Sequence, residues 1–340
     1  MIVSATQAQV VEQGEAAVVY YSPKTEVALD FVYSVETQEM GIYAQYAEKL
    51  LGVKDALMEN KTVYTLENVF IGTRTQTDYA RPHKVVAEAA VPLLLSINEK
   101  GLLMGYNLPP YEKKAGNNAH NSGEKPAIKS RITGTPVACF SEEVLEAATP
   151  EAQANAVAKQ ILHLRETRMY LLNGEVEHAP ADGKAMQLVL DELNKQEKAL
   201  TELFVGKKGK RTEHKHITLQ PETMPELLFF SEENGFTDAE NIDADTIRVN
   251  VELHPQEFKA VDESKKAKKG KAPEVSQIVY NLPGSGDVQV VFDGRILGKR
   301  SISIAQLGVD VPLAKDVFTG STLPVIIFNE KTGNILSISK

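Results

Sequence analysis

The sequence predicts an α+β protein in which mostly antiparallel β modules flank a long helical hairpin at the centre of the chain. Two amphipathic helical segments follow one another in the middle, period-2 alternation of apolar residues marks both flanking parts, and tight turns join consecutive strands. Strands joined by tight turns pair antiparallel, whereas parallel strands need long crossovers. We therefore expect an N-terminal β-rich domain at 16–148, the hairpin at 149–210 and a C-terminal β-rich domain at 211–340.

The N-terminal domain is expected to open with a strand at Thr25–Val35, where apolar and polar residues alternate. Ser22-Pro23-Lys24 precedes it and is typical of a turn. A short helix is expected at Ile42–Leu51, because Gly52 can adopt the left-handed conformation that ends a helix.

Further strands follow, and two of them form a hairpin. Their expected ranges are Thr62–Thr75, Lys84–Ala89, Leu93–Ile97 and Leu102–Tyr106. The last two flank Asn98-Glu99-Lys100-Gly101, which is typical of a tight turn.

The central hairpin carries start and stop signals on both helices. Thr149 can cap the first helix, Pro150 fits its first turn, and Asn173-Gly174 ends it; Asp182-Gly183 opens the second helix. Residues at helical spacing form the expected inner faces: Val157, Ile161, Leu164 and Leu171 in the first helix, and Met186, Val189, Leu190, Leu193, Leu200, Leu203 and Phe204 in the second. The two helices should pack antiparallel on each other and on a neighbouring sheet.

The C-terminal domain is again β-rich. Asp293-Gly294 is a strong two-residue hairpin signal, and Pro283–Asp287 is interpreted as a β-turn, since it lacks the lysine and the following helix of a phosphate-binding loop. Strands are expected at His216–Leu219, Leu227–Phe230, Ile247–Leu253, Val288–Phe292, Arg295–Leu297, Val325–Phe328 and Ile335–Ser339.

Two polar breaks and two lysine-rich runs interrupt this pattern. Pro109–Lys129 and Phe258–Pro273 contain few apolar residues and are expected to be loops. Lys207–Arg211 and Lys265–Lys271 are interpreted as solvated loops, with contact to an anionic surface as the alternative.

Bulk properties exclude several classes of protein. A formal charge of -9 argues against a general nucleic-acid-binding protein, and no apolar run is long enough to cross a bilayer. The single cysteine, Cys139, has no partner for an intramolecular disulfide and no identified base that would make it a nucleophile. No motif for a cofactor is present, so none is expected.

Candidate site residues are few. His214 and His216 lie two apart on an expected strand and so share a face, as two metal ligands would, although the sequence identifies no third ligand and a solvated strand edge is the alternative. A carbohydrate-binding or adhesion surface would need exposed aromatic rings. The candidates for it are Tyr43, Tyr46, Tyr106 and Tyr111.

Several longer segments resemble one known family. They include Tyr20-Tyr-x-Pro-Lys-Thr-x-Val27, Tyr43–Asp55, Leu171-Leu-Asn-Gly-Glu175 and Gln306–Leu313. The chain resembles a family of exported proteins of unknown function, of about this length, from Gram-negative anaerobes of the gut. The resemblance implies export to the periplasm or cell surface and assigns no activity, substrate or catalytic residue.

The start of the chain also bears on whether the protein is exported. Met1–Ala8 ends in small residues at the spacing of a signal-peptidase site but lacks a charged start and a full apolar core. Residues 1–15 are therefore interpreted as the remnant of an export signal, with chance likeness and a cytoplasmic location as the alternatives.

Taken together, these features favour a non-catalytic envelope or surface protein with a binding or assembly role and an envelope protein or glycan as partner. The first alternative is a hydrolase of an unfamiliar kind, acting on an envelope polymer or glycan in a cleft between a β module and the hairpin. The second is a carbohydrate-binding or adhesion module.

Overall fold

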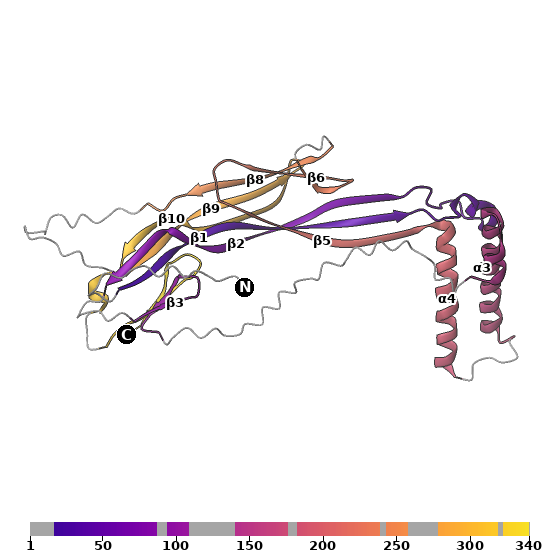
Figure 1. The fold of residues 1–340 in the computed structure, drawn as a ribbon, viewed down its shortest axis with the longest axis horizontal. Helices are drawn as coiled ribbons and strands as arrows, with labels where there is room; N and C mark the ends of the chain where they lie inside the picture. Colours follow the sequence, from indigo (N-terminus) through magenta and orange to yellow (C-terminus); the bar gives the residue numbers. More distant parts are fainter. Residues whose placement is uncertain are drawn as a thin grey trace, which may run out of the picture.

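The fold is an elongated β body from which three strands extend to a group of helices (Figure 1). The computed structural model describes residues 17–86, 94–108, 140–175, 182–238, 243–257, 278–318 and 322–339. It is β-rich and antiparallel with a few helices, as the α+β prediction states. The loop at Pro109–Lys129, Cys139, and the lysine-rich run at Lys265–Lys271 lie outside the described residues, as do Met1–Ala8.

The longest strands form a three-stranded sheet with the order β2-β1-β5. It consists of β1 (Ala17–Glu39), β2 (Lys61–Val86) and β5 (Lys207–Leu219). Both neighbours of β1 pair with it antiparallel. β5 pairs with the C-terminal part of β1, from Val27 opposite Leu219 to Glu39 opposite Lys207.

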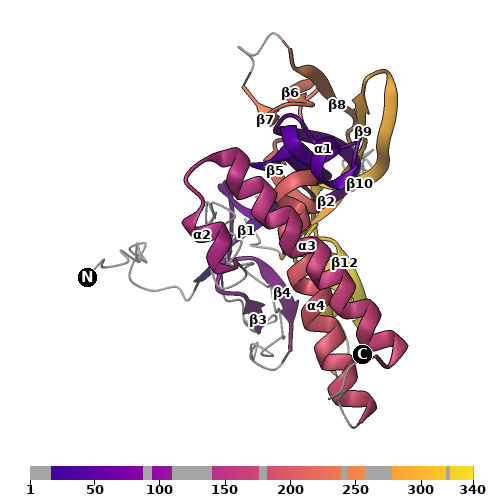
Figure 2. The same ribbon diagram turned by 90° about the vertical axis from the view of Figure 1, so that its right-hand side faces the viewer.

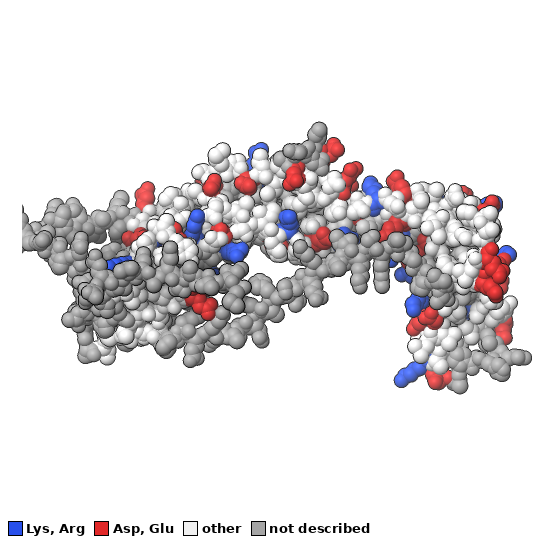
Figure 3. Space-filling model, in the orientation of Figure 1, with Lys and Arg blue, Asp and Glu red and all other residues white. Residues whose placement is uncertain are grey.

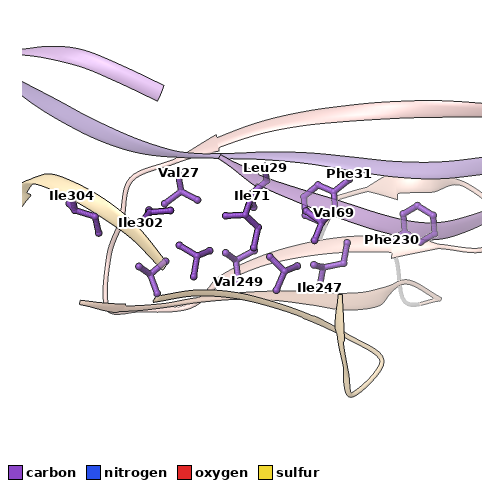
Figure 4. Packing of buried hydrophobic residues seen from close by; sticks show 13 residues of the cluster. Val27, Leu29, Phe31, Val69, Ile71, Phe230, Ile247, Val249, Ile302 and Ile304 are labelled. Atoms are coloured by element: carbon purple, nitrogen blue, oxygen red, sulfur yellow. The ribbon is translucent and has the colours of Figure 1, made fainter. Parts of the chain in front are cut away.

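A five-stranded sheet with the order β10-β9-β8-β6-β7 packs on the middle of this ribbon, over Val27–Phe31 of β1 and Val69–Ile71 of β2. Its strands are β6 (Glu226–Ser231), β7 (Gly235–Thr237), β8 (Asp245–His254), β9 (Val279–Phe292) and β10 (Arg295–Pro312). The apolar faces of the two sheets meet in one core, part of which Figure 4 shows. Buried members include Leu29, Phe31, Ile71, Val249 and Ile304. Burial of apolar surface between two sheets is what holds a β-sandwich together.

A third, smaller sheet has the order β12-β11-β4-β3. It combines β3 (Leu95–Ile97) and β4 (Leu103–Tyr106) with β11 (Val325–Phe328) and β12 (Ile335–Ser339). A short 3₁₀-helix, η4 (Lys315–Phe318), precedes its C-terminal strands in the chain.

The expected N-terminal and C-terminal β-rich segments share their sheets. β1 pairs with β5, and β4 pairs with β11, so strands on opposite sides of the central helices lie in one sheet. The β part of the molecule is therefore a mixed body in which the segments at 16–148 and 211–340 are interleaved.

Two predicted turns are wrong, because each lies inside a long strand. Ser22-Pro23-Lys24 belongs to β1, and the register of the pairing between β1 and β2 shifts between Tyr21 and Ser22. Pro283–Asp287 belongs to β9. Its glycines are needed for close packing, since a Cβ on Gly284 would lie 2.7 Å from Leu307 Cβ and 2.8 Å from His254 O.

The lysine-rich run at Lys207–Arg211 is also not a loop. It forms the first residues of β5, which lies at the edge of its sheet. Charged side chains on an edge strand discourage pairing with other chains, which explains a basic run at this position.

Candidate functional site: the helical head

The helices gather at the far end of the three long strands, in a unit that we call the helical head (Figures 1 and 2). It contains η1 (Ala44–Tyr46), α1 (Ala47–Leu51), α2 (Glu142–Glu146), α3 (Pro150–Asn173) and α4 (Gly183–Val205). We call the strand ends that carry it, residues 35–39, 61–63 and 207–211, the arm. The expected packing of the helices on the face of a sheet is not observed, because the head has its own core.

The predicted caps position the two long helices. Thr149 Oγ1 accepts a hydrogen bond from Ala152 N at 3.2 Å, and Asp182 Oδ1 accepts one from Ala185 N at 2.7 Å. Gly174 ends α3 at a φ of 74°, in the left-handed conformation. The N-caps of both helices and the C-cap of α3 are thus correctly predicted from the sequence.

The core of the head involves only the parts of the helices near the arm. Val157 and Ile161 of α3 and Leu200 and Phe204 of α4 are completely buried. Phe204 stacks at an angle on Tyr43, with ring centroids 5.5 Å apart. Deep burial at this end anchors the helices to the tip of the arm.

Backbone contacts join the head to the arm. Tyr43 N donates to Leu203 O at 2.8 Å, and Leu57 N donates to Val205 O at 3.0 Å. Gly206, at a φ of 82°, then turns the chain from α4 directly into β5. The head is therefore tied to all three strands of the arm through the segments that enter and leave them.

One carboxylate links α3 to α4. Arg165 Nε donates to Glu197 Oε1 at 2.6 Å, and Arg168 Nη1 donates to Glu197 Oε2 at 2.5 Å and to Asn194 Oδ1 at 2.8 Å. Burial acts to raise the pKa of Glu197, but the hydrogen bonds and charges of the two arginines outweigh it and hold that pKa below its ordinary value. Glu197 is therefore an ionised structural link.

A hollow of about 580 Å³ lies between the two helices and the start of β5. Five basic side chains and two acidic ones line it: Arg165, Arg168, Lys198, Lys207 and Lys208, with Glu197 and Glu202. Thr201 also lines it, and the Thr201 hydroxyl is shielded from solvent without a hydrogen-bond partner. On a chain of net charge -9, this hollow is a local basic site.

Charge is distributed unevenly over the head. Figure 3 shows a group of acidic side chains on its outer side, at the right of the view, and side chains of both signs on the side that faces the body. The two sides of the head therefore differ in charge.

The end of the head away from the arm exposes large apolar side chains. We call this set the apolar free end: Met169, Tyr170, Leu172, Leu188 and Val189, with exposed fractions from 39% to 70%. Val189 was expected on the inner face of the second helix and is instead exposed, while Leu200, Leu203 and Phe204 are buried as predicted. Both faces of α3 are apolar here, because Leu171 is buried beside exposed Leu172.

The structure brings His214 and His216 together with a residue that the sequence did not indicate. Asp30 on β1 lies 3.2 Å from the Nδ1 atom of each histidine, and the two rings lie 6.4 Å apart. Both histidines are on one face of β5, as their spacing predicts. Asp30 could not be found from the sequence, because its pairing with β5 spans a separation of 186 residues, from position 30 to position 216.

The tyrosines proposed as an aromatic platform do not form one. Tyr43 is 5% exposed and Tyr106 is 0% exposed, each within a hydrophobic core, and Tyr46 is half-buried against the head core. Tyr111 lies outside the described residues. Buried rings cannot stack on a sugar, so these three tyrosines give no support to a carbohydrate-binding surface.

A third polar group resembles a catalytic triad in composition only. Ser22 Oγ lies 2.7 Å from His83 Nε2, and Asp310 Oδ2 lies 3.7 Å from the same nitrogen. In a hydrolase triad the carboxylate holds the other ring nitrogen and the serine faces the substrate, whereas Ser22 is 4% exposed. Burial, opposed by Asp310 and assisted by Arg81, lowers the pKa of His83, so this histidine is neutral at physiological pH.

Sequence reasoning missed the basic hollow itself. Arg165 and Arg168 are spaced three apart on one side of α3, which was the available signal, but their partner Glu197 becomes visible only once the helices are placed antiparallel.

Among the helices of the described residues, none combines the length and apolar character needed to cross a bilayer.

Comparison with known proteins gives one match. The family model of a domain of unknown function, DUF4831, matches residues 16–336. No curated protein and no solved structure matches the chain. Because the family model covers nearly the whole sequence, the chain belongs to the DUF4831 family.

Proposed function

We propose that this protein acts by binding, in an assembly role, and that the helical head is its binding end. The observation that carries the proposal is the apolar free end, which exposes five large apolar side chains in the last turns of α3 and the first turns of α4, away from the arm. Exposed apolar groups that gather on one surface mark sites of protein–protein contact.

The partner is a protein that offers an apolar segment with carboxylates beside it. Leu188 and Met169, exposed by 70% and 60%, supply the apolar contact. Lys207 and Lys208, at the start of β5, line the hollow at the arm end of the helical pair and supply the basic contact. An amphipathic helix laid along a helical pair is a common arrangement of this kind.

Binding is favoured over hydrolysis by the state of the ionisable groups in the hollow. Glu197 is held by two arginines and Glu202 lies 4.0 Å from Lys198. A general acid needs a raised pKa and a general base needs an unpaired carboxylate, and Glu197 offers neither. The hollow thus suits electrostatic recognition of an acidic partner.

We also propose that this role is carried out outside the cytoplasm, in the periplasm or at the cell surface. The support is the likeness of the chain to exported proteins. Fractionation of the bacterium that produces it, followed by immunoblotting of each fraction, tests the location. Recovery with a cytoplasmic marker enzyme would contradict it.

The assembly role predicts a specific effect of charges placed on the apolar free end. In native extracts, we expect the wild-type protein to migrate in a complex larger than the monomer and the Met169→Glu/Leu188→Glu variant to migrate as the monomer. Both side chains are already exposed, so the substitutions leave the fold intact. Size-exclusion chromatography with immunodetection measures the difference.

The matched control is Met224→Glu/Leu336→Glu, which alters a methionine and a leucine that are 81% and 62% exposed on the β body. This control should keep the large complex. A monomeric wild-type protein, or loss of the complex in the control as well, would contradict the proposal.

A further inference from the structure

The exposed face of the five-stranded sheet carries a group of metal-binding side chains far from the head. Glu252 and His254 lie two apart on β8 and share a face, and Asp287 on β9 lies directly opposite Glu252. One ligand atom from each of the three lies within 4.8 Å of the other two. His254 Nε2 is 3.6 Å from Asp287 Oδ2.

The pairing of the two carboxylates is unfavourable without a cation. Like charges directly opposite each other on neighbouring strands destabilise a sheet. The Ser301 hydroxyl donates a hydrogen bond to Asp287, which faces Glu252 across the strands.

We propose that Glu252, His254 and Asp287 form a binding site for a divalent transition-metal ion such as Zn²⁺ or Mn²⁺. One imidazole nitrogen and two carboxylate oxygens are a donor set that these ions accept. Metal–ligand bonds of about 2.0–2.2 Å place two ligands of one ion at most about 4.4 Å apart. The observed separations therefore need only small rotations of side chains that are partly or fully exposed.

The group around Asp30 is less suited to this role. There a single carboxylate lies within hydrogen-bond distance of both His214 and His216. The group on β8 and β9 has two carboxylates for one histidine, and a cation would remove the repulsion between Glu252 and Asp287. The two histidine groups thus provide an internal comparison.

The test is a titration of the full chain, without a histidine tag and stripped with a chelator, with Zn²⁺ by calorimetry and with Co²⁺ by visible absorption. We expect one equivalent to bind. Glu252→Gln, His254→Ala and Asp287→Asn should each weaken binding by about tenfold or more, because each removes one ligand of three. The control His214→Ala/His216→Ala should bind as the wild type does.

Thermal unfolding gives a second readout that does not depend on the binding signal. Zn²⁺ should raise the Tm of the wild type and leave that of His254→Ala unchanged. Glu252→Gln should raise the Tm of the metal-free protein, because it removes the repulsion. Absence of saturable binding, or binding that survives in His254→Ala and is lost in the His214/His216 variant, overturns the proposal.

Discussion

At the scale of single residues, Gly41 is a position where the chain passes close to the backbone of α4. A Cβ at this position would lie 2.4 Å from Leu203 O, a backbone atom that cannot swing away. We expect Gly41→Ala to lower the free energy of unfolding of the head by about 1–3 kcal/mol, as overpacking does. Thermal unfolding followed by circular dichroism at a helical wavelength measures it.

Gly183→Ala is the matched control. Gly183 is the first residue of α4, and a Cβ there meets no atom within 4 Å. Alanine favours the helix and restricts the unfolded chain, so this variant should be as stable as the wild type or more stable. Equal losses in the two alanine variants would show that Gly41 is not a packing constraint.

Glu197 is the residue whose charge links the two long helices. Glu197→Gln should destabilise the head by about 1–2 kcal/mol at neutral pH, because it weakens two charge-assisted hydrogen bonds. Since the folded-state pKa is depressed below the ordinary value of 4.5, this stability is present above pH 4.5 and is lost as the pH falls through the folded pKa.

Unfolding measured across this acid range therefore distinguishes the variant from the wild type. The stability difference between them should shrink as the pH drops below 4.5. Glu192→Gln, on the exposed side of α4, should change stability by less than about 0.5 kcal/mol. A difference that is independent of pH would mean that the link does not depend on charge.

The helix caps and one hairpin turn are the features that the sequence predicted most accurately. Thr149, Asp182 and Gly174 act as the expected caps, and Asp293-Gly294 forms the expected turn with positive φ at both residues. These are local requirements of backbone hydrogen bonding and conformation. The turn predicted at Pro283–Asp287 fails because glycine there serves close contact between strands, which the local sequence cannot distinguish from a turn.

At the scale of elements, the head and the β body have separate hydrophobic cores. Phe204 is completely buried in the first and Phe31 in the second. Phe204→Ala should destabilise the head by about 3–5 kcal/mol through cavity formation and leave the body folded. Hydrogen exchange, followed by mass spectrometry, should show loss of protection in α3 and α4 and retained protection in β8 and β9.

Phe31→Ala is the complementary variant and should reduce protection in the β body. If Phe204→Ala exposed the amides of β8 and β9 equally, the head and the body would be one cooperative unit.

The two helices were predictable because their periodicity is local, but their attachment to the tip of an arm was not, since it depends on contacts such as Tyr43 N to Leu203 O.

At the scale of the whole molecule, the arrangement joins segments that are far apart in the chain. β5 lies beside β1 and β11 beside β4, so two of the sheets combine strands that precede the central helices in the sequence with strands that follow them. Period-2 alternation predicts a strand but does not identify its neighbour. For the same reason neither Asp30 beside His216 nor Asp287 beside Glu252 could be predicted from the sequence.

The position of the head at the end of the arm supports the proposal that the head is the binding end. The body is held together by an apolar core between two sheets, and the head exposes apolar side chains at the end of an arm. A surface held away from the body is accessible to a large partner.

Photo-crosslinking in the producing cells tests the claim that the head is the binding end most directly. A photo-reactive phenylalanine analogue would replace Met169 in one strain and Met224 on the body in another, since both side chains are exposed. We predict a discrete adduct with one partner at Met169 and none at Met224. Adducts of equal yield at both positions, or at Met224 alone, would contradict the account.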